Sequence, residues 1–304
     1  MLKKTFIMTL IFSLCAALGL YAAKVQSGWE QDNLKGKVKT VTYTRTKVVK
    51  KSTDKTVTKY DANGSRSEKA SYDGTGDLSS NEIYKYDDSW NMIEKIKYRA
   101  DKTPSSRTVY AYDGNGNKVE ETVYDAKGSF SIKETYKYDS SGNKIEYSLY
   151  ETEKSQPLKS LFKYDSKGNI TEETRYSPKG ILFMKITNKY DAAGKLIEAV
   201  TWSAVSVFEK GPVTTSILYK NDAAGNVIEE TSYKSDGSVS IKTTSMYDAK
   251  GNKIEEARYK ADGSLLRKEL YKYDATGNVI EKIIKSDEIT ITEKITWTYQ
   301  YYKK

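Results

Sequence analysis

A tyrosine-led unit of 26 residues recurs along most of this 304-residue chain, and this period constrains the fold more than any other feature. The opening residues are 26 apart, except for one step of 31 that ends on an asparagine: Tyr60, Tyr86, Tyr112, Tyr138, Tyr164, Tyr190, Asn221, Tyr247, Tyr273 and Tyr299. Periods of roughly 20–50 residues are typical of repeat architectures. The sequence therefore predicts an array of about nine repeats over 60–304.

Each unit reads as one β-hairpin. Its first turn has the pattern Tyr-Asp-x-x-Gly-Asn, in which the aspartate caps the turn and the glycine accepts a positive φ. The stretches between turns alternate in polarity and are rich in Val, Ile, Thr and Tyr, as strands are. The expected fold is all-β, an antiparallel meander of roughly 18 strands that forms a long curled or spiralling sheet.

Opposite charges recur at two positions of the unit. Counting from the opening tyrosine as zero, a glutamate stands at +8 and a basic residue at +21. If the second turn pairs +12 with +17, these side chains face each other and fix the register of the two strands. The expected pairs are Glu94–Arg107, Glu120–Lys133, Glu146–Lys159, Glu172–Lys185, Glu229–Lys242, Glu255–Lys268 and Glu281–Lys294.

The other face of the sheet is expected to be apolar. In the unit that opens at Tyr112, this face should hold Val119, Val123, Phe130, Ile132 and Tyr136, between Tyr112 and Tyr138. A sheet with one apolar side must curl, spiral or fold onto itself to cover that side.

The first 23 residues have the composition of a secretory signal peptide. A basic start is followed by an apolar run and small residues, which indicates cleavage after Ala22 or Ala23. A retained membrane anchor is the alternative, and Leu14 before Cys15 disfavours a lipoprotein. After cleavage no cysteine would remain, which suits a bacterial envelope protein that is periplasmic, on the outer surface or secreted.

Residues 24–59 form a degenerate leading unit that is strongly basic. Between 35 and 59 there are nine lysines and arginines against Asp54 alone. We consider two explanations: lysines that protect an exposed edge strand from pairing with another molecule, or a docking patch for an anionic polymer or lipid headgroup. The residues that would form this patch are Lys37, Lys39, Arg45 and Lys47.

Aromatic residues in variable turns are the other candidate ligand contacts. Trp90 replaces the glycine of one first turn, and Trp202 and Phe208 lie at or in the single insertion, near 203–212. Variation on one face of a repeat array often marks its binding face, although loops also drift without constraint.

The chain resembles the RHS/YD repeat family of bacterial surface and toxin proteins. The resemblance covers roughly residues 60–301 and depends on YDANG (60–64), YDGNGN (112–117), YDSSGN (138–143), YDSKGN (164–169), YDAKGN (247–252) and YDATGN (273–278). It implies a spiralling β-strand shell and a possible affinity for carbohydrate. The period here is longer and more uniform than the usual unit, and no toxin domain follows the array.

Reactive chemistry is scarce in this sequence. The chain has no histidine, and its one cysteine, Cys15, would leave with the signal peptide, so histidine- or cysteine-based triads, common zinc sites and thiol chemistry are excluded. Adjacent glutamates such as Glu120 and Glu121 point to opposite faces of a strand and cannot act on one bond. We expect no enzyme activity, cofactor, metal or nucleic acid.

The predicted function is therefore that of an exported, non-enzymatic repeat protein that binds a polymer, for example a glycan, or a protein partner of the envelope. A structural scaffold of the envelope is the alternative. An outer-membrane β-barrel is disfavoured because the acids at +9 would face lipid: Glu121, Glu173, Glu230 and Glu256. Contact with a membrane surface would use 35–59, and the oligomeric state is open.

Overall fold

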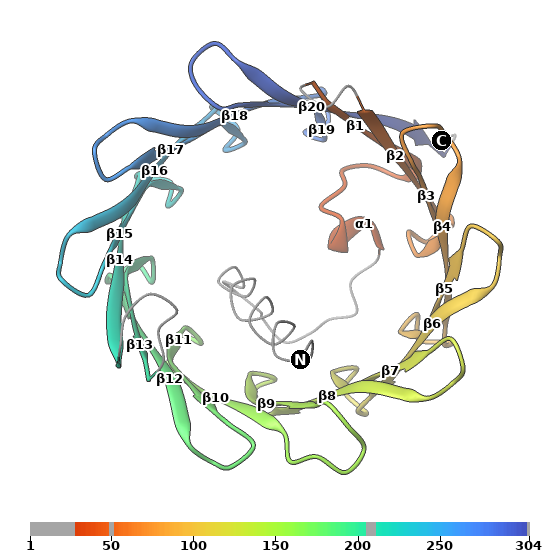
Figure 1. The fold of residues 1–304 in the computed structure, drawn as a ribbon, viewed down its shortest axis with the longest axis horizontal. Helices are drawn as coiled ribbons and strands as arrows, with labels where there is room; N and C mark the ends of the chain where they lie inside the picture. Colours follow the sequence, from red (N-terminus) through yellow and green to blue (C-terminus); the bar gives the residue numbers. More distant parts are fainter. Residues whose placement is uncertain (1–27, 49–51, 205–210, 303–304) are drawn as a thin grey trace.

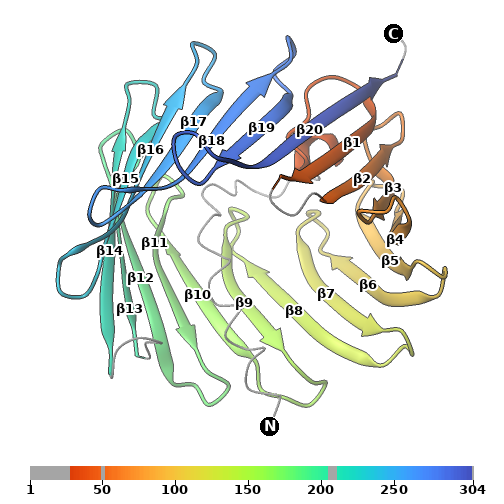
Figure 2. The ribbon, with the colours of Figure 1, turned by 45° about the horizontal axis from the view of Figure 1, so that its top comes forward.

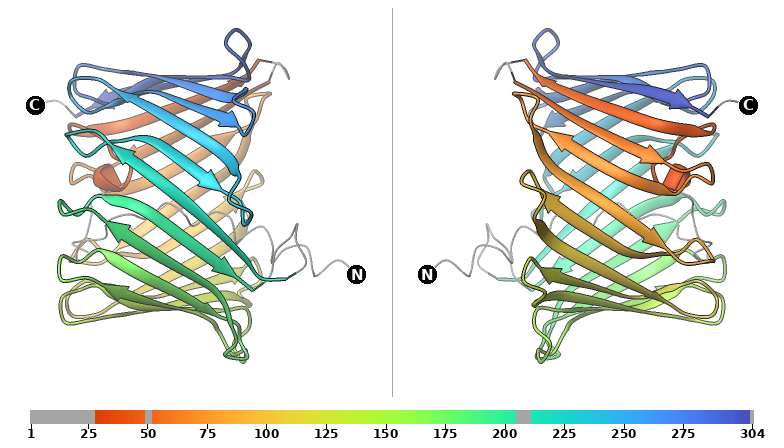
Figure 3. Two further views of the ribbon diagram at one scale, coloured as in Figure 1. Left: turned by 90° about the vertical axis from the view of Figure 1, so that its left-hand side faces the viewer. Right: turned by 90° about the vertical axis from the view of Figure 1, so that its right-hand side faces the viewer.

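The chain forms one antiparallel sheet that closes into a 20-stranded barrel. The computed structural model describes residues 28–48, 52–204 and 211–302. Each strand pairs with its neighbours in sequence, and β1 also pairs with β20, which completes the ring seen in Figure 1. The strands tilt against the barrel axis (Figure 2), and their turns form two rims (Figure 3). The predicted all-β meander is confirmed, and its curl is a full closure.

The described elements are one short helix and the twenty strands. In chain order they are α1 (Gly28–Gln31), β1 (Val38–Lys47), β2 (Ser52–Tyr60), β3 (Arg66–Tyr72), β4 (Leu78–Tyr86), β5 (Met92–Arg99), β6 (Pro104–Tyr112), β7 (Lys118–Asp125), β8 (Phe130–Tyr138), β9 (Lys144–Tyr150), β10 (Leu158–Tyr164), β11 (Ile170–Tyr176), β12 (Leu182–Tyr190), β13 (Leu196–Ser203), β14 (Val213–Asn221), β15 (Val227–Tyr233), β16 (Val239–Tyr247), β17 (Lys253–Lys260), β18 (Leu265–Tyr273), β19 (Val279–Lys285) and β20 (Ile291–Tyr301). In this described part, no helix is long and apolar enough to cross a membrane.

Helix α1 identifies the inner face of the barrel. It lies within the ring of strands in Figure 1, and Asp32, just after it, hydrogen-bonds to Tyr60 and Arg66. These two side chains therefore point into the lumen. Because side chains alternate along a strand, the register then assigns the other residues to the lumen or to the outer face.

The predicted apolar side is mostly the lumen wall. In the unit that opens at Tyr112, Val123 pairs with Ile132, and Tyr136 lies two residues before the inward Tyr138. The prediction that Phe130 lies on the apolar side is wrong. It pairs with Tyr124, which is opposite Arg107 on the outer face, because a bulge between Val123 and Tyr124 shifts the register.

The outer face carries the glutamates at +8 with their basic partners. Each of the seven expected pairs forms an ion pair, at 2.5–3.4 Å in the six other than Glu94–Arg107. The assumed register is wrong by two residues, since Glu120 is opposite Thr135 and Lys133 is opposite Thr122. The pairs therefore reach diagonally across the two strands, which long side chains allow.

A second lysine holds most of these glutamates from the other side. It is the residue just before the tyrosine that opens the unit of that glutamate, as in Lys137–Glu146 at 3.1 Å and Lys163–Glu172 at 2.7 Å. Hydrogen bonds from Lys163 and then Lys185 lower the pKa of the Glu172 carboxyl. Each such glutamate is therefore a bridge between three neighbouring strands.

The opening tyrosines join consecutive strands from inside the barrel. The hydroxyl of Tyr138 donates to the carbonyl of Lys118, at the bulge that starts β7, over 2.8 Å. The same bond spans 20 residues in eight units, at 2.6–3.0 Å, from Tyr86, Tyr112, Tyr138, Tyr164, Tyr190, Tyr247, Tyr273 and Tyr299. After the five-residue insertion, the Asn221 amide replaces the hydroxyl and donates to Leu196.

Replacing Tyr138 by phenylalanine should lower the free energy of unfolding by about 1 kcal/mol, because one half-buried hydrogen bond is lost. Urea unfolding followed by circular dichroism would measure this. Tyr124→Phe is the matched control in the same repeat, since the Tyr124 hydroxyl has no hydrogen bond in the described structure. Equal stability of the two variants would show that the tyrosine bond is dispensable.

Candidate functional site

The aromatic residues expected to bind a ligand lie far apart. Trp90 is in the turn between β4 and β5, is 49% exposed and has a φ of 65° where other units have glycine. Trp202 is near the end of β13, at the opposite rim, and is half-buried. Phe208 lies outside the described residues. Trp90 and Trp202 cannot share one ligand.

The basic leading segment does not form one patch. Arg45 makes a bidentate ion pair with Glu293, and Lys47 pairs with Asp54 at 2.8 Å. Lys39 lies 6.0 Å from the ring centre of Tyr302, and the Lys37 carbonyl accepts a hydrogen bond from the Tyr302 backbone. The explanation by a protected edge strand is wrong, because β1 is paired on both sides.

The segment after α1 is fastened to the inner wall beside the seam between β20 and β1. Trp29 donates from Nε1 to the Val38 carbonyl and packs on Gly64, where an added Cβ would lie 2.6 Å from the indole. The amide of Asn278, only 2% exposed, bonds to the backbone N–H and carbonyl of Lys35. In the other repeats this asparagine bonds to its own turn, as Asn117 does to Asp113.

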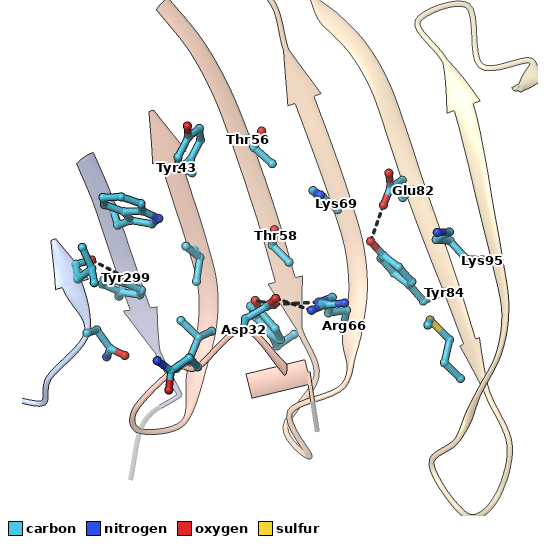
Figure 4. Close-up of a pocket in the computed structure, with 18 residues that line it drawn as sticks. Asp32, Tyr43, Thr56, Thr58, Arg66, Lys69, Glu82, Tyr84, Lys95 and Tyr299 are labelled. Atoms are coloured by element: carbon cyan, nitrogen blue, oxygen red, sulfur yellow. Dashed lines mark hydrogen bonds and ion pairs between the residues drawn. The ribbon is translucent and has the colours of Figure 1, made fainter. Parts of the chain in front are cut away.

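A cavity of about 770 Å³ opens beside this segment (Figure 4). Its lining combines aromatic rings, charged groups and hydroxyls from β1 to β5, β19 and β20. Trp297 meets Tyr43 edge to face, with ring centres 5.5 Å apart. The volume falls within the usual range of small-molecule sites. The polar and aromatic residues of its lining include Tyr43, Thr56, Thr58, Arg66, Lys69, Glu82, Tyr84, Lys95, Trp297 and Tyr299.

Two polar contacts hold the cavity wall in place. The Tyr84 hydroxyl donates to Glu82 over 2.7 Å, and burial, followed by this bond, raises the pKa of Tyr84. Arg66 donates to Asp32 through Nε at 2.8 Å and through Nη2. Burial acts to lower the pKa of Arg66, but its hydrogen bonds to Asp32 outweigh that effect and raise it.

Charges at +9 face the lumen. The prediction that the glutamates at +9 would face lipid in a membrane barrel is therefore wrong. Glu121, for example, is opposite Tyr110, which points into the lumen. The acids here have basic partners on the same wall: Lys118 for Glu121, Arg175 for Glu173 and Lys253 for Glu256, at 2.6–2.7 Å. Burial raises the pKa of Glu230.

Lysines and aromatic rings alternate along the wall from β6 to β10. Lys118 Nζ lies 5.6 Å from the ring centre of Tyr110 and 4.9 Å from that of Tyr136. Lys144 Nζ lies 5.9 Å from Tyr136 and 4.9 Å from the ring centre of Phe162. These cation–π contacts keep the rings upright on the wall. Burial lowers the pKa of Lys144.

Nothing in the described ranges gathers three or more acidic, histidine or cysteine side chains into a group that could hold a metal ion. The lumen groups are hydrogen-bond donors and acceptors, ammonium groups and aromatic faces. Such groups can bind a polar ligand and can orient it.

Comparison with known proteins identifies neither a family nor a function for this chain. A family model described as "Uncharacterised protein" matches residues 112–240, and no curated protein matches the chain. The crystal structure of TcdB2-TccC3 matches 82% of this chain at 14% identity with a TM-score of 0.49, and the match spans 15% of that chain. A porin-like protein from Bacteroides uniformis ATCC 8492 matches 86% of this chain and 96% of its own, at 10% identity and a TM-score of 0.38. The RHS/YD resemblance therefore stays a prediction.

None of the described ligand contacts predicted from the sequence lines this cavity. A signal for it lies at +9, which is lysine in three units (Lys69, Lys95 and Lys282) and glutamate in four others.

Proposed function

We propose that this protein is a non-enzymatic binding barrel of the bacterial envelope or its surroundings, which holds a segment of glycan in its lumen. The observation that carries the proposal is the cavity of about 770 Å³, where Tyr43, Tyr84 and Trp297 stand among ammonium, carboxylate and hydroxyl groups. The apolar face of a sugar ring packs on aromatic rings, while its hydroxyls exchange hydrogen bonds with such polar groups. Export depends on the predicted signal peptide, which lies outside the described residues.

A wide barrel suits this role. Eight strands give an interior that side chains fill, whereas 16–18 strands leave an aqueous channel, so about 20 strands leave room for a polymer. The lumen tyrosines are mostly half-buried, which keeps their edges accessible.

Two other functions have less support. A scaffold that assembles edge to edge needs an unpaired strand, and all twenty described strands have two partners.

An outer-membrane barrel would place the outer glutamates and lysines against lipid. A lysine there costs about 2–4 kcal/mol at the bilayer midplane.

Glycan binding can be tested by titration calorimetry of the full chain with oligosaccharides selected on a glycan array. Trp297→Ala should weaken binding at least about tenfold, because one stacking surface is lost. Trp202→Ala, on the outer face, is the matched control and should change the affinity less than about twofold.

If Trp297→Ala disturbs folding, Thr56→Trp offers a second variant, since it adds bulk to the cavity and leaves the β1–β20 seam intact. The proposal fails if no oligosaccharide binds, or if both variants bind as tightly as the natural protein.

A further inference from the structure

We propose that the ligand of this lumen is an acidic glycan, whose carboxylates are held by Lys69 and Lys95. This inference rests on the proposed function and names its ligand class. The two lysines line the cavity from β3 and β5 and are labelled in Figure 4.

The first reason is a reversal of charge at one repeat position. At +9, the units that form β7, β11, β15 and β17 carry glutamate, whereas those that form β3, β5 and β19 carry lysine. All these side chains face the lumen by register. The lysines at +9 therefore lie on strands near the seam, where the cavity and this basic arc are, and the glutamates at +9 lie on the other strands.

The second reason is that Lys69 and Lys95 form no ion pair within the described structure, whereas Lys282, the other lysine at +9, pairs with Glu269. In the described part of the chain, no carboxylate lies within ion-pair distance of Lys69, Lys95 or the adjacent inward Lys97. Glu82 is opposite Lys69 and Lys97 in register, but one of its oxygens accepts the Tyr84 hydroxyl. Three of the glutamates at +9 on the other arc, in contrast, have basic partners.

The geometry favours a chain with repeated carboxylates over a small anion. Lys69 and Lys95 lie on strands two apart and are offset by two residues along them, so their backbones are roughly 12 Å from each other. Tyr84 projects from β4 between them, where Lys95 is its direct partner. A carboxylated sugar chain can place acid groups on both lysines and a ring face on the tyrosine. An inorganic anion would offer no ring face to the tyrosine.

The test is calorimetry on the full chain with a tetramer of galacturonic acid. Its neutral match is the same tetramer with each carboxyl reduced to an alcohol, and inorganic tripolyphosphate is the third probe. The acidic tetramer should bind at least about tenfold more tightly than the neutral one, because charge-assisted hydrogen bonds are the stronger ones. Its affinity should also fall as salt rises.

The variant Lys95→Glu introduces the residue that β7 carries at the same repeat position, which is Glu121. Folding should therefore be retained. It should weaken binding of the acidic tetramer at least about tenfold, and Lys95→Gln should weaken it less. Lys127→Glu, in an exposed turn at the second rim, makes the same change in net charge and should change the affinity less than about twofold.

The outcomes separate this inference from the function beneath it. Equal binding of acidic and neutral tetramers, lost in Trp297→Ala and kept in Lys95→Glu, overturns the inference and leaves glycan binding standing. Tighter binding of tripolyphosphate than of the acidic tetramer also overturns it, in favour of a phosphate ligand. Binding of none of the probes overturns this inference, and glycan binding is overturned as well only if no oligosaccharide of the array binds.

Discussion

Above pH 10 the protein is expected to unfold as the tyrosines of the lumen ionise. Burial raises the pKa of Tyr86, Tyr112 and Tyr164 to about 12. A folded-state pKa above the ordinary value of 10.0 means that the neutral phenol stabilises the fold below pH 10. That stability is lost as pH rises from 10 toward 12, at about 1.4 kcal/mol per pKa unit and group. Burial also raises the pKa of Tyr43, Tyr60, Tyr84, Tyr110, Tyr136, Tyr138, Tyr147, Tyr190, Tyr271, Tyr273 and Tyr299.

Absorbance at 295 nm reports phenolate, and circular dichroism reports the sheet, so one pH titration follows both. We expect part of the phenolate signal to appear only together with loss of the sheet. The double variant Tyr86→Phe, Tyr112→Phe should make the unfolding free energy less dependent on pH in this range. Full ionisation near pH 10 with the sheet intact would contradict the prediction.

Much of the fold could be predicted from the sequence because its determinants are local and repeated. The Asp-x-x-Gly-Asn turns appear as expected, with Asp113 Oδ1 accepting from the backbone of Asn115 and Asn117. The glutamate–lysine pairs are also local, because each lies within one hairpin. Their register was wrong by two residues because the bulge in each hairpin has no distinct sequence signature.

Closure of the barrel could not be predicted in the same way. It depends on β1 meeting β20, for example Tyr43 opposite Trp297, across about 250 residues of sequence. The segment of β1 also lacks the Tyr-Asp motif. Without closure, the inner and outer faces cannot be told apart, so the sequence pointed only to variable turns and to the basic leading segment. Lys69 and Lys95 became a candidate site only when closure placed β3 and β5 beside the seam.

Replacing Asp32 by alanine should lower the free energy of unfolding by about 2–3 kcal/mol. The Asp32 carboxylate accepts hydrogen bonds from Arg66 and from Tyr60, and their loss would leave the guanidinium of Arg66 without a counter-charge on the inner wall. Removing one partner of a buried ion pair costs about 3–5 kcal/mol. We expect a smaller loss of stability for this pair, because the side chains of Arg66 and Asp32 are 21% and 31% exposed.

Urea unfolding followed by tryptophan fluorescence would measure the change, with Trp29 and Trp297 near the site. The double variant Asp32→Ala, Arg66→Met should recover part of the lost stability, because it removes the unpaired charge as well as the carboxylate. If α1 is held by this carboxylate, Asp32→Ala should also speed hydrogen exchange at the Trp29 and Leu34 amides, which bond to Gly64 and Trp29 carbonyls. Wild-type stability in Asp32→Ala, or a double variant weaker than the single one, would show that the pair does not fasten the segment to the wall.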